Sequence, residues 1–84
     1  MAKLLEKPEE LKVTTNIEGT PLTIARNGKA ERITMIYKNW RESAQMQSQE
    51  ILKNCFRVRT SKGLICDIYR DIASNLWYLD RICD

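Results

Sequence analysis

Hydrophobic and polar residues alternate most regularly in the last third of the chain, over residues 55–82. Phe56 and Val58 alternate with two arginines, which is the period of two expected of a strand with one buried face. The sequence Ser61-Lys62-Gly63 then predicts a turn, and residues 64–69 form the returning strand. A second turn and a last strand follow, so this region predicts three antiparallel strands.

The turn at Gly63 can be given a register. A three-residue loop with a left-handed Gly63 places Val58 opposite Cys66, whereas a two-residue loop places Val58 opposite Asp67. Burial of Val58 beside an unpaired carboxylate is the more unfavourable arrangement, so we expect the three-residue loop. The other predicted pairs are Phe56 with Ile68 on the buried side, Arg57 with Asp67 on the opposite side, and Thr60 with Leu64.

The first half of the chain predicts two further turns between strands. Residues 12–17 are rich in β-branched side chains, and residues 18–21 have the composition of a turn. Asn27-Gly28 is the strongest hairpin signal, because a type I′ turn needs positive φ at both central positions. With this two-residue loop, Leu22 faces Ile33 on the expected core side.

The strand that follows this hairpin, from about residue 30 to residue 41, changes its parity along its length. One face carries Ile33, Met35 and Tyr37, and the other carries Ile36 and Trp40. A β-bulge near residues 36–38 would return Trp40 to the core and curl the sheet. The alternative is a strand covered on both faces; in so small a protein we expect the bulge.

Residues 42–52 are the one segment without strand character. The run from Ser43 to Glu50 is polar, unbranched and rich in glutamine, and Ser43 is available as an N-cap. The segment therefore predicts a short surface helix or, alternatively, a mobile loop. Ala73-Ser74-Asn75 predicts the turn into the last strand, residues 76–79, and the register of this turn stays open.

Residues 1–10 are charged and interrupted by Pro8, so we expect a flexible N-terminal segment; a helical turn over residues 8–11 is the alternative. Residues 11–84 then form a single β-domain. Its five to six short strands must hide their edges and one face, so the expected all-β fold is a strongly curled antiparallel sheet or small barrel, with one short helix allowed in the 42–52 segment. The expected core contains Phe56, Val58, Ile68 and Leu79, with Cys66 as a small buried hydrophobe.

Charge and composition bear on the location more than on the function. Fourteen basic and 11 acidic residues give a net charge of +3, well below the dense positive charge of a dedicated DNA-binding protein. No apolar run approaches the roughly 20 residues that span a membrane as a helix, and no secretory signal is visible. We therefore expect a cytoplasmic protein, without a membrane partner, whose cysteines are reduced thiols.

The sequence contains little catalytic chemistry. It has no histidine, which removes the commonest general base and the commonest zinc ligand. The three cysteines form no Cys-x-x-Cys pair, so we expect no metal and no cofactor. Asp67, Asp71 and Asp80 could converge as in a hydrolase, but a solvated rim paired with arginines is the more economical interpretation. We expect a protein that is not an enzyme.

Aromatic and basic residues are the remaining candidate chemistry. In sites for single-stranded nucleic acid, bases stack on aromatic rings and guanidinium groups contact phosphates. The alternative is that the tryptophans are core or edge-covering residues and that the arginines pair with aspartates across strands. The candidate residues for binding nucleic acid or another partner are Arg57, Arg59, Arg81, Trp40 and Trp77.

Three motifs resemble a family of small bacterial β-domains of unknown function. They are the pair Trp40-Arg41, the strand Phe56-Arg57-Val58-Arg59-Thr60 and the strand Trp77-Tyr78-Leu79, and the resemblance covers residues 13–84. Members of that family occur as free-standing proteins, and some are associated with translesion DNA-polymerase-like proteins. This sequence departs from the family pattern in residues 42–50 and at Cys83, where aromatic residues are expected. The resemblance implies a fold and no established activity.

The leading hypothesis is a non-enzymatic binding or accessory module whose partner is single-stranded nucleic acid or another protein. The alternative is a structural domain for protein–protein interaction, or for self-association through a strand edge or through residues 77–79. An enzyme is the weakest hypothesis, for want of a base and a nucleophile. Salt separates the first two, because phosphate contacts weaken steeply as counterions compete and apolar association does not.

Overall fold

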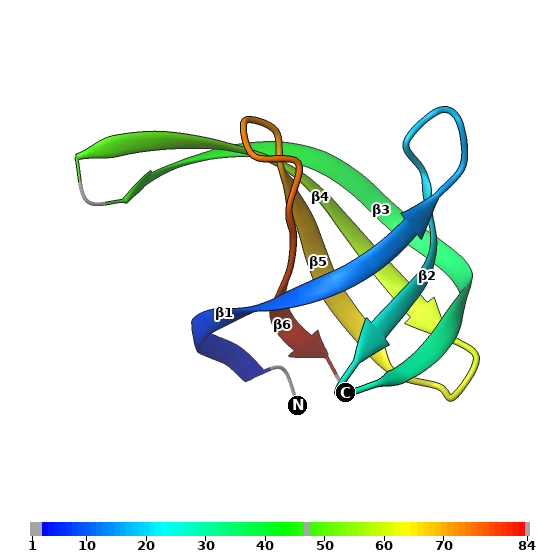
Figure 1. The fold of residues 1–84 in the computed structure, drawn as a ribbon. Helices are drawn as coiled ribbons and strands as arrows, with labels where there is room; N and C mark the ends of the chain where they lie inside the picture. Colours follow the sequence, from blue (N-terminus) through cyan, green and yellow to red (C-terminus); the bar gives the residue numbers. More distant parts are fainter. Residues whose placement is uncertain (1–2, 47, 84) are drawn as a thin grey trace.

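The computed structural model describes residues 3–46 and 48–83, and these residues form six strands and no helix. Among them there is accordingly no helix that is long and apolar enough to cross a membrane. The strands are β1 (Lys3–Thr15), β2 (Pro21–Arg26), β3 (Lys29–Met46), β4 (Gln49–Thr60), β5 (Ile65–Asp71) and β6 (Trp77–Cys83). Each strand pairs antiparallel with the next, and β6 pairs with β1, which closes a barrel (Figure 1). The prediction of a small antiparallel barrel is confirmed.

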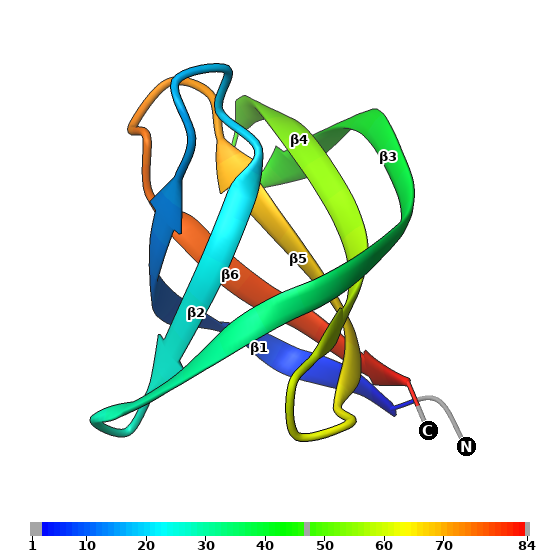
Figure 2. The same ribbon diagram turned by 90° about the vertical axis from the view of Figure 1, so that its right-hand side faces the viewer.

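The two longest strands, β1 and β3, exchange partners along their length. The first part of β1 pairs with β6, and its residues 12–15 pair with β2. Residues 29–32 of β3 pair with β2, and β3 pairs with β4 from residue 33 onwards. Figure 2 shows how these strands wrap around the barrel axis, with the β1–β2 and β5–β6 turns at the same end. Because β1 and β3 pair with different neighbours at different positions along their length, the six strands close into a barrel.

The predicted hairpin registers are those of the structure. Val58 pairs with Cys66, Phe56 with Ile68 and Arg57 with Asp67. Gly63 has a φ of 86°, and the Thr60 amide donates to the Leu64 carbonyl at 2.8 Å, as a three-residue loop requires. Asn27 and Gly28 have φ values of 50° and 77°, which fits the predicted type I′ turn.

The core cluster lies inside the barrel and includes the predicted core residues Phe56, Val58, Cys66, Ile68 and Leu79. Its buried members are Leu11, Ile24, Phe56, Val58, Cys66, Ile68, Trp77 and Leu79. The placement of Leu22 in the core is wrong, because its side chain is 47% exposed. Thr14 pairs with Thr23 and Thr15 pairs with Pro21, so Leu22 is an extra residue at a bulge, and Ile24 takes the core position.

The predicted bulge in β3 is present, but Trp40 does not return to the core. The register shifts between Ile36 and Lys38 as expected, and it also shifts between Ile33 and Met35. A single bulge would turn the Trp40 side chain toward the core. Two bulges reverse the alternation of inward and outward side chains twice, so the Trp40 side chain stays on the outside of the barrel. Trp40 pairs with Cys55, on the face opposite to the core.

The described part of the 42–52 segment forms no helix, and most of it is strand. Residues 42–46 belong to β3 and residues 49–52 to β4, and these strands pair from Glu42 opposite Lys53 to Met46 opposite Gln49. In Figure 1 this hairpin extends beyond the barrel as a two-stranded arm. The ladder with β4 overrides the helix propensity of the glutamine-rich run, because each strand position gains a cross-strand partner that an isolated helix of this length lacks.

The N-terminal segment also differs from expectation over the residues that the structure describes. Residues 3–10 are part of β1 instead of a flexible segment or a helical turn, and Glu9 and Glu10 pair with Leu79 and Tyr78 of β6. The register shifts between Leu4 and Glu9, which is where Pro8 lies. Proline has no N–H for a ladder, and a register shift is a position that tolerates it.

Candidate nucleic-acid interface

A row of mainly aromatic side chains crosses the outer face of β3–β6. Trp40 pairs with Cys55, Cys55 with Tyr69, and Tyr69 with Tyr78, so these four residues are cross-strand neighbours. The residues next to them in the chain, such as Phe56 and Ile68, belong to the core, and therefore the four point outward. We call Trp40, Cys55, Tyr69 and Tyr78 the outer row.

The aromatic rings of the outer row are held in place by each other and by lysines. The rings of Tyr69 and Tyr78 are stacked, with centroids 5.2 Å apart. Lys53 Nζ lies 4.4 Å from the centroid of Tyr69, and Lys38 Nζ lies 5.0 Å from that of Trp40. Both distances are typical of cation–π contacts, so each lysine brings positive charge to an aromatic face. The Trp40 indole is fixed further by its Nε1, which donates to Glu42 Oε1 at 2.7 Å.

The middle and the ends of the outer row differ in exposure. Tyr69 and Cys55 are only 4% and 5% exposed, although neither belongs to the core cluster, so neighbouring side chains cover them on the outside of the barrel. Trp40 and Tyr78 at the two ends are half-buried. The rings accessible to a partner are therefore those of Trp40 and Tyr78, and the middle of the row supports them.

Burial keeps the polar groups of the middle residues neutral. Burial and, to a smaller extent, repulsion by Glu42 and Asp80, respectively, raise the pKa of the Cys55 thiol and of the Tyr69 hydroxyl to about 12. A thiol with so high a pKa is a poor nucleophile near neutral pH. These residues pack and do not perform acid–base chemistry.

A second row, of charged residues, runs beside the first. Lys38 pairs with Arg57, Arg57 with Asp67, and Asp67 with Arg81. Arg57 Nε and Nη2 donate to the two carboxylate oxygens of Asp67 at 2.8 and 3.1 Å. The hydrogen bond and charge of Asp67 raise the pKa of Arg57 above its ordinary value. Arg57 is therefore engaged by a carboxylate that is itself only 6% exposed.

The structure brings four of the five candidate residues to one face. Trp40, Arg57, Arg59 and Arg81 lie on the outer face of β3–β6, and Arg59 is exposed. Trp77 does not join them. Its ring points into the barrel, is 6% exposed and lies 5.7 Å from the ring of Phe56, centroid to centroid.

Sequence reasoning missed part of this face. Tyr69 and Tyr78 of the outer row, and Lys53, whose Nζ lies over the Tyr69 ring, were not among the candidates. The predicted pair of Phe56 with Ile68 already turns Tyr69 outward, so a signal for this residue was present. Tyr78 could not be placed, because the register of the last hairpin was open; the structure pairs Tyr69 with Tyr78 and shifts the register between Asp67 and Ile68.

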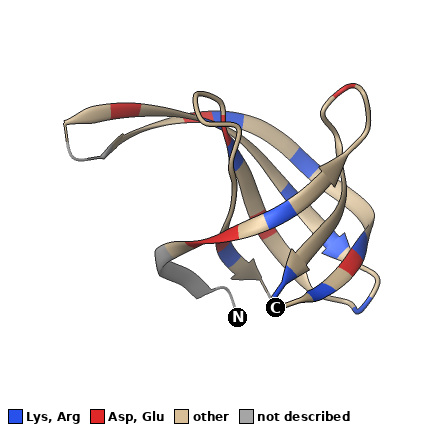
Figure 3. Ribbon diagram, viewed as in Figure 1, with Lys and Arg blue, Asp and Glu red and all other residues tan. Residues whose placement is uncertain are grey.

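Acidic and basic residues are interspersed along the strands, as Figure 3 shows. On the outer face the acids Glu42 and Asp67 each accept a hydrogen bond from a neighbouring side chain. Within the described ranges, His, Cys, Asp and Glu form no group of three or more that could hold a metal ion. The face offers aromatic rings and cations for binding.

Comparison of this chain with known protein families, with curated proteins and with solved structures finds no match. The interpretation of the outer face therefore depends on its own geometry.

Proposed function

We propose that this protein is a non-enzymatic binding module that holds single-stranded nucleic acid on the outer face of β3–β6. The supporting observation is that Trp40 and Tyr78, the half-buried ends of the outer row, share this face with lysine and arginine side chains. Three strand spacings of about 4.8 Å each separate the two rings, so the rings can stack on different bases of one strand. Lys38, Arg59 and Arg81 lie on the strands that carry the rings or between them, where they can contact phosphates.

A single strand fits this face better than a duplex. The described residues contain no helix to enter a major groove, and the outer row is a convex surface of rings. A splayed strand presents its bases to such rings without unpairing. We further propose a cytoplasmic location and membership of the small bacterial β-domain family, on the composition and the three motifs given above.

The test is a titration of a labelled oligothymidylate of about ten nucleotides, followed by fluorescence anisotropy at low salt. We expect binding in the micromolar range that weakens with salt, with a slope of about −0.7 per phosphate contact. Trp40→Ala should weaken binding by about 1–3 kcal/mol, the usual effect of removing one stacking ring. Arg59→Glu should weaken it and should also lower the salt slope.

Arg32→Glu is the matched control, because Arg32 is also exposed but lies where β3 pairs with β2, outside the outer face. It makes the same change of net charge as Arg59→Glu and should leave most of the affinity intact. Equal losses from the two variants would show that only net charge matters. No binding at tens of micromolar protein would refute the nucleic-acid proposal.

A second candidate function is self-association through the free edge of β3. From residue 33 onwards one edge of β3 pairs with β4, and no described strand pairs with its other edge. Met35, Ile36 and Tyr37 are exposed on this stretch, and unpaired strand edges with exposed apolar side chains add further strands. Sedimentation at low and high salt separates the two functions: a dimer that persists in high salt supports edge pairing.

A further inference from the structure

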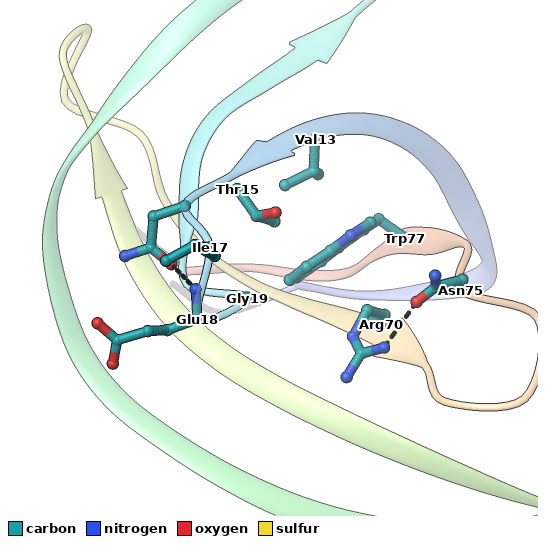
Figure 4. A pocket seen from close by; sticks show the side chains of 9 residues that line it. Val13, Thr15, Ile17, Glu18, Gly19, Arg70, Asn75 and Trp77 are labelled. Atoms are coloured by element: carbon teal, nitrogen blue, oxygen red, sulfur yellow. Dashed lines mark hydrogen bonds between the residues drawn. The ribbon is translucent and has the colours of Figure 1, made fainter.

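A polar pocket of about 400 Å³ opens at the end of the barrel that carries the β1–β2 and β5–β6 turns. The mouths of β-barrels are common sites for small ligands, and this volume lies within their usual range. Val13, Ile17 and Trp77 form the apolar part of its wall, and Arg70 of β5 also lines it (Figure 4). The β1–β2 turn and Asn75 complete it. This pocket is separate from the outer row.

The guanidinium groups of three arginines in this barrel can be compared by the acceptors that they contact. Arg26 directs its Nε and Nη2 at the carboxylate of Glu9, at 3.0 and 3.5 Å. Arg57 directs the same two nitrogens at Asp67. Arg70 differs: its Nη1 donates to Asn75 Oδ1 at 2.6 Å, and its Nε is buried with no acceptor among the described residues.

Asn75 holds Arg70 in this orientation. It has a φ of 67°, and its amide donates to the Asp71 carbonyl at 2.8 Å, so the turn fixes its side chain beside Arg70. With Nη1 engaged, the edge formed by Nε and Nη2 is the one that could take an oxyanion. A buried donor without an acceptor is unfavourable, and an incoming acceptor would remove this penalty.

We propose that the barrel-mouth pocket binds a small organic anion, with two oxygens of a carboxylate or phosphate on the Nε–Nη2 edge of Arg70 and an aromatic or apolar body against Trp77. Arginine binds both oxyanions in this bidentate form. Glu18, the one acid in the wall, points away from Arg70 in Figure 4 and is exposed, so it does not compete for the guanidinium. Because Nε is buried, an oxygen can reach it only when the atoms that cover it move aside.

Phenyl phosphate and phenylacetate are the probes, because they share a ring and differ in the oxyanion. Benzyl alcohol is the neutral control. Each is titrated to about 10 mM into ¹⁵N-labelled protein, a range that covers millimolar affinity. The readouts are the Nε–H resonance of Arg70 and the indole N–H resonance of Trp77.

We expect both resonances to shift saturably with at least one anion and not with benzyl alcohol. A response to phenyl phosphate alone assigns the pocket to phosphate esters, and a response to phenylacetate alone assigns it to carboxylates. Arg70→Lys keeps the charge but removes the fork, and it should weaken binding at least about tenfold. Arg32→Lys, at a residue that does not line the pocket, should bind as the wild type does.

No saturable shift of the Arg70 resonance with either anion overturns the proposal, and so does an equal shift with benzyl alcohol. These outcomes are read from the wild-type protein, so they hold even if the Arg70 variant does not fold. Full binding by a folded Arg70→Lys protein overturns it as well.

Discussion

At Arg57 a binding role and a structural role compete, and the geometry favours the structural one. The guanidinium meets Asp67 through two hydrogen bonds, and the carboxylate of Asp67 is buried on the outer face. If Arg57 left to contact a phosphate, a charged oxygen pair would remain buried and unpaired. Arg59 is exposed and does not neutralise a buried carboxylate, so of these two arginines it is the better candidate for a phosphate contact.

Arg57→Ala should therefore lower the free energy of unfolding by about 1–3 kcal/mol, although the arginine is partly exposed. Arg59→Ala on the same strand should change it by no more than about 0.5 kcal/mol. Urea denaturation of the two variants measures the difference. Asp67→Asn in the Arg57→Ala background should restore part of the loss, because the buried charge is then gone. Equal denaturation midpoints for the two alanine variants would contradict a structural role for Arg57.

At the scale of elements, strand position and turn type were predictable where local rules decide them. The Gly63 loop leaves one arrangement that keeps Val58 away from an unpaired carboxylate, and Asn27-Gly28 supplies the positive φ values of a type I′ turn; both turns were predicted correctly. The arm over residues 42–52 was not predictable in this way, because helix-forming side chains there are overruled by pairing with a strand. The predicted position of Trp40 was wrong for a related reason, because no pattern in the sequence indicates the second bulge in β3.

The tip of the arm offers a test of its hairpin structure. Ser48 has a φ of 70°, which is unfavourable for a residue with a side chain, so Ser48→Gly should stabilise the protein by about 0.5–1 kcal/mol. Ser43→Gly, in the strand of the same arm, should destabilise it by a similar amount. Thermal unfolding measures both. A helix over this segment would be destabilised by both substitutions, so two losses would contradict the hairpin.

At the scale of the whole molecule, closure of the barrel depends on contacts that local patterns do not reveal. Alternation in the sequence indicates strands and a curled sheet, but the pairing of β1 with β6 joins the two ends of the chain. The charged start of β1 was predicted to be flexible because the strand with which it pairs lies about 70 residues later in the sequence, as the pairing of Glu9 with Leu79 shows. The outer row also depends on long-range pairing, since its four residues become neighbours only when four strands are in register.

The closed barrel also predicts how stability depends on pH. Burial raises the pKa values of Cys55 and Cys66 from 9.0, and of Tyr69 from 10.0, to about 12. Below pH 9 all three groups are protonated in both states, and their contribution to stability is complete. Between pH 9 and about 12 the unfolded chain releases these protons and the folded barrel retains them. The unfolded state then binds fewer protons, and the free energy of unfolding falls as pH rises.

We expect a plateau of stability below pH 9 and a decline above it, measured as urea denaturation midpoints across this range. Cys55→Ala removes one of the three groups, so the slope of its unfolding free energy above pH 9 should be shallower by about one proton. The comparison uses slopes, and a uniform loss of stability in the variant does not affect it. Parallel slopes for the variant and the wild type would mean that Cys55 ionises equally in both states. The thiol would then be open to solvent, and the cover that the outer row provides in the structure would be absent in solution.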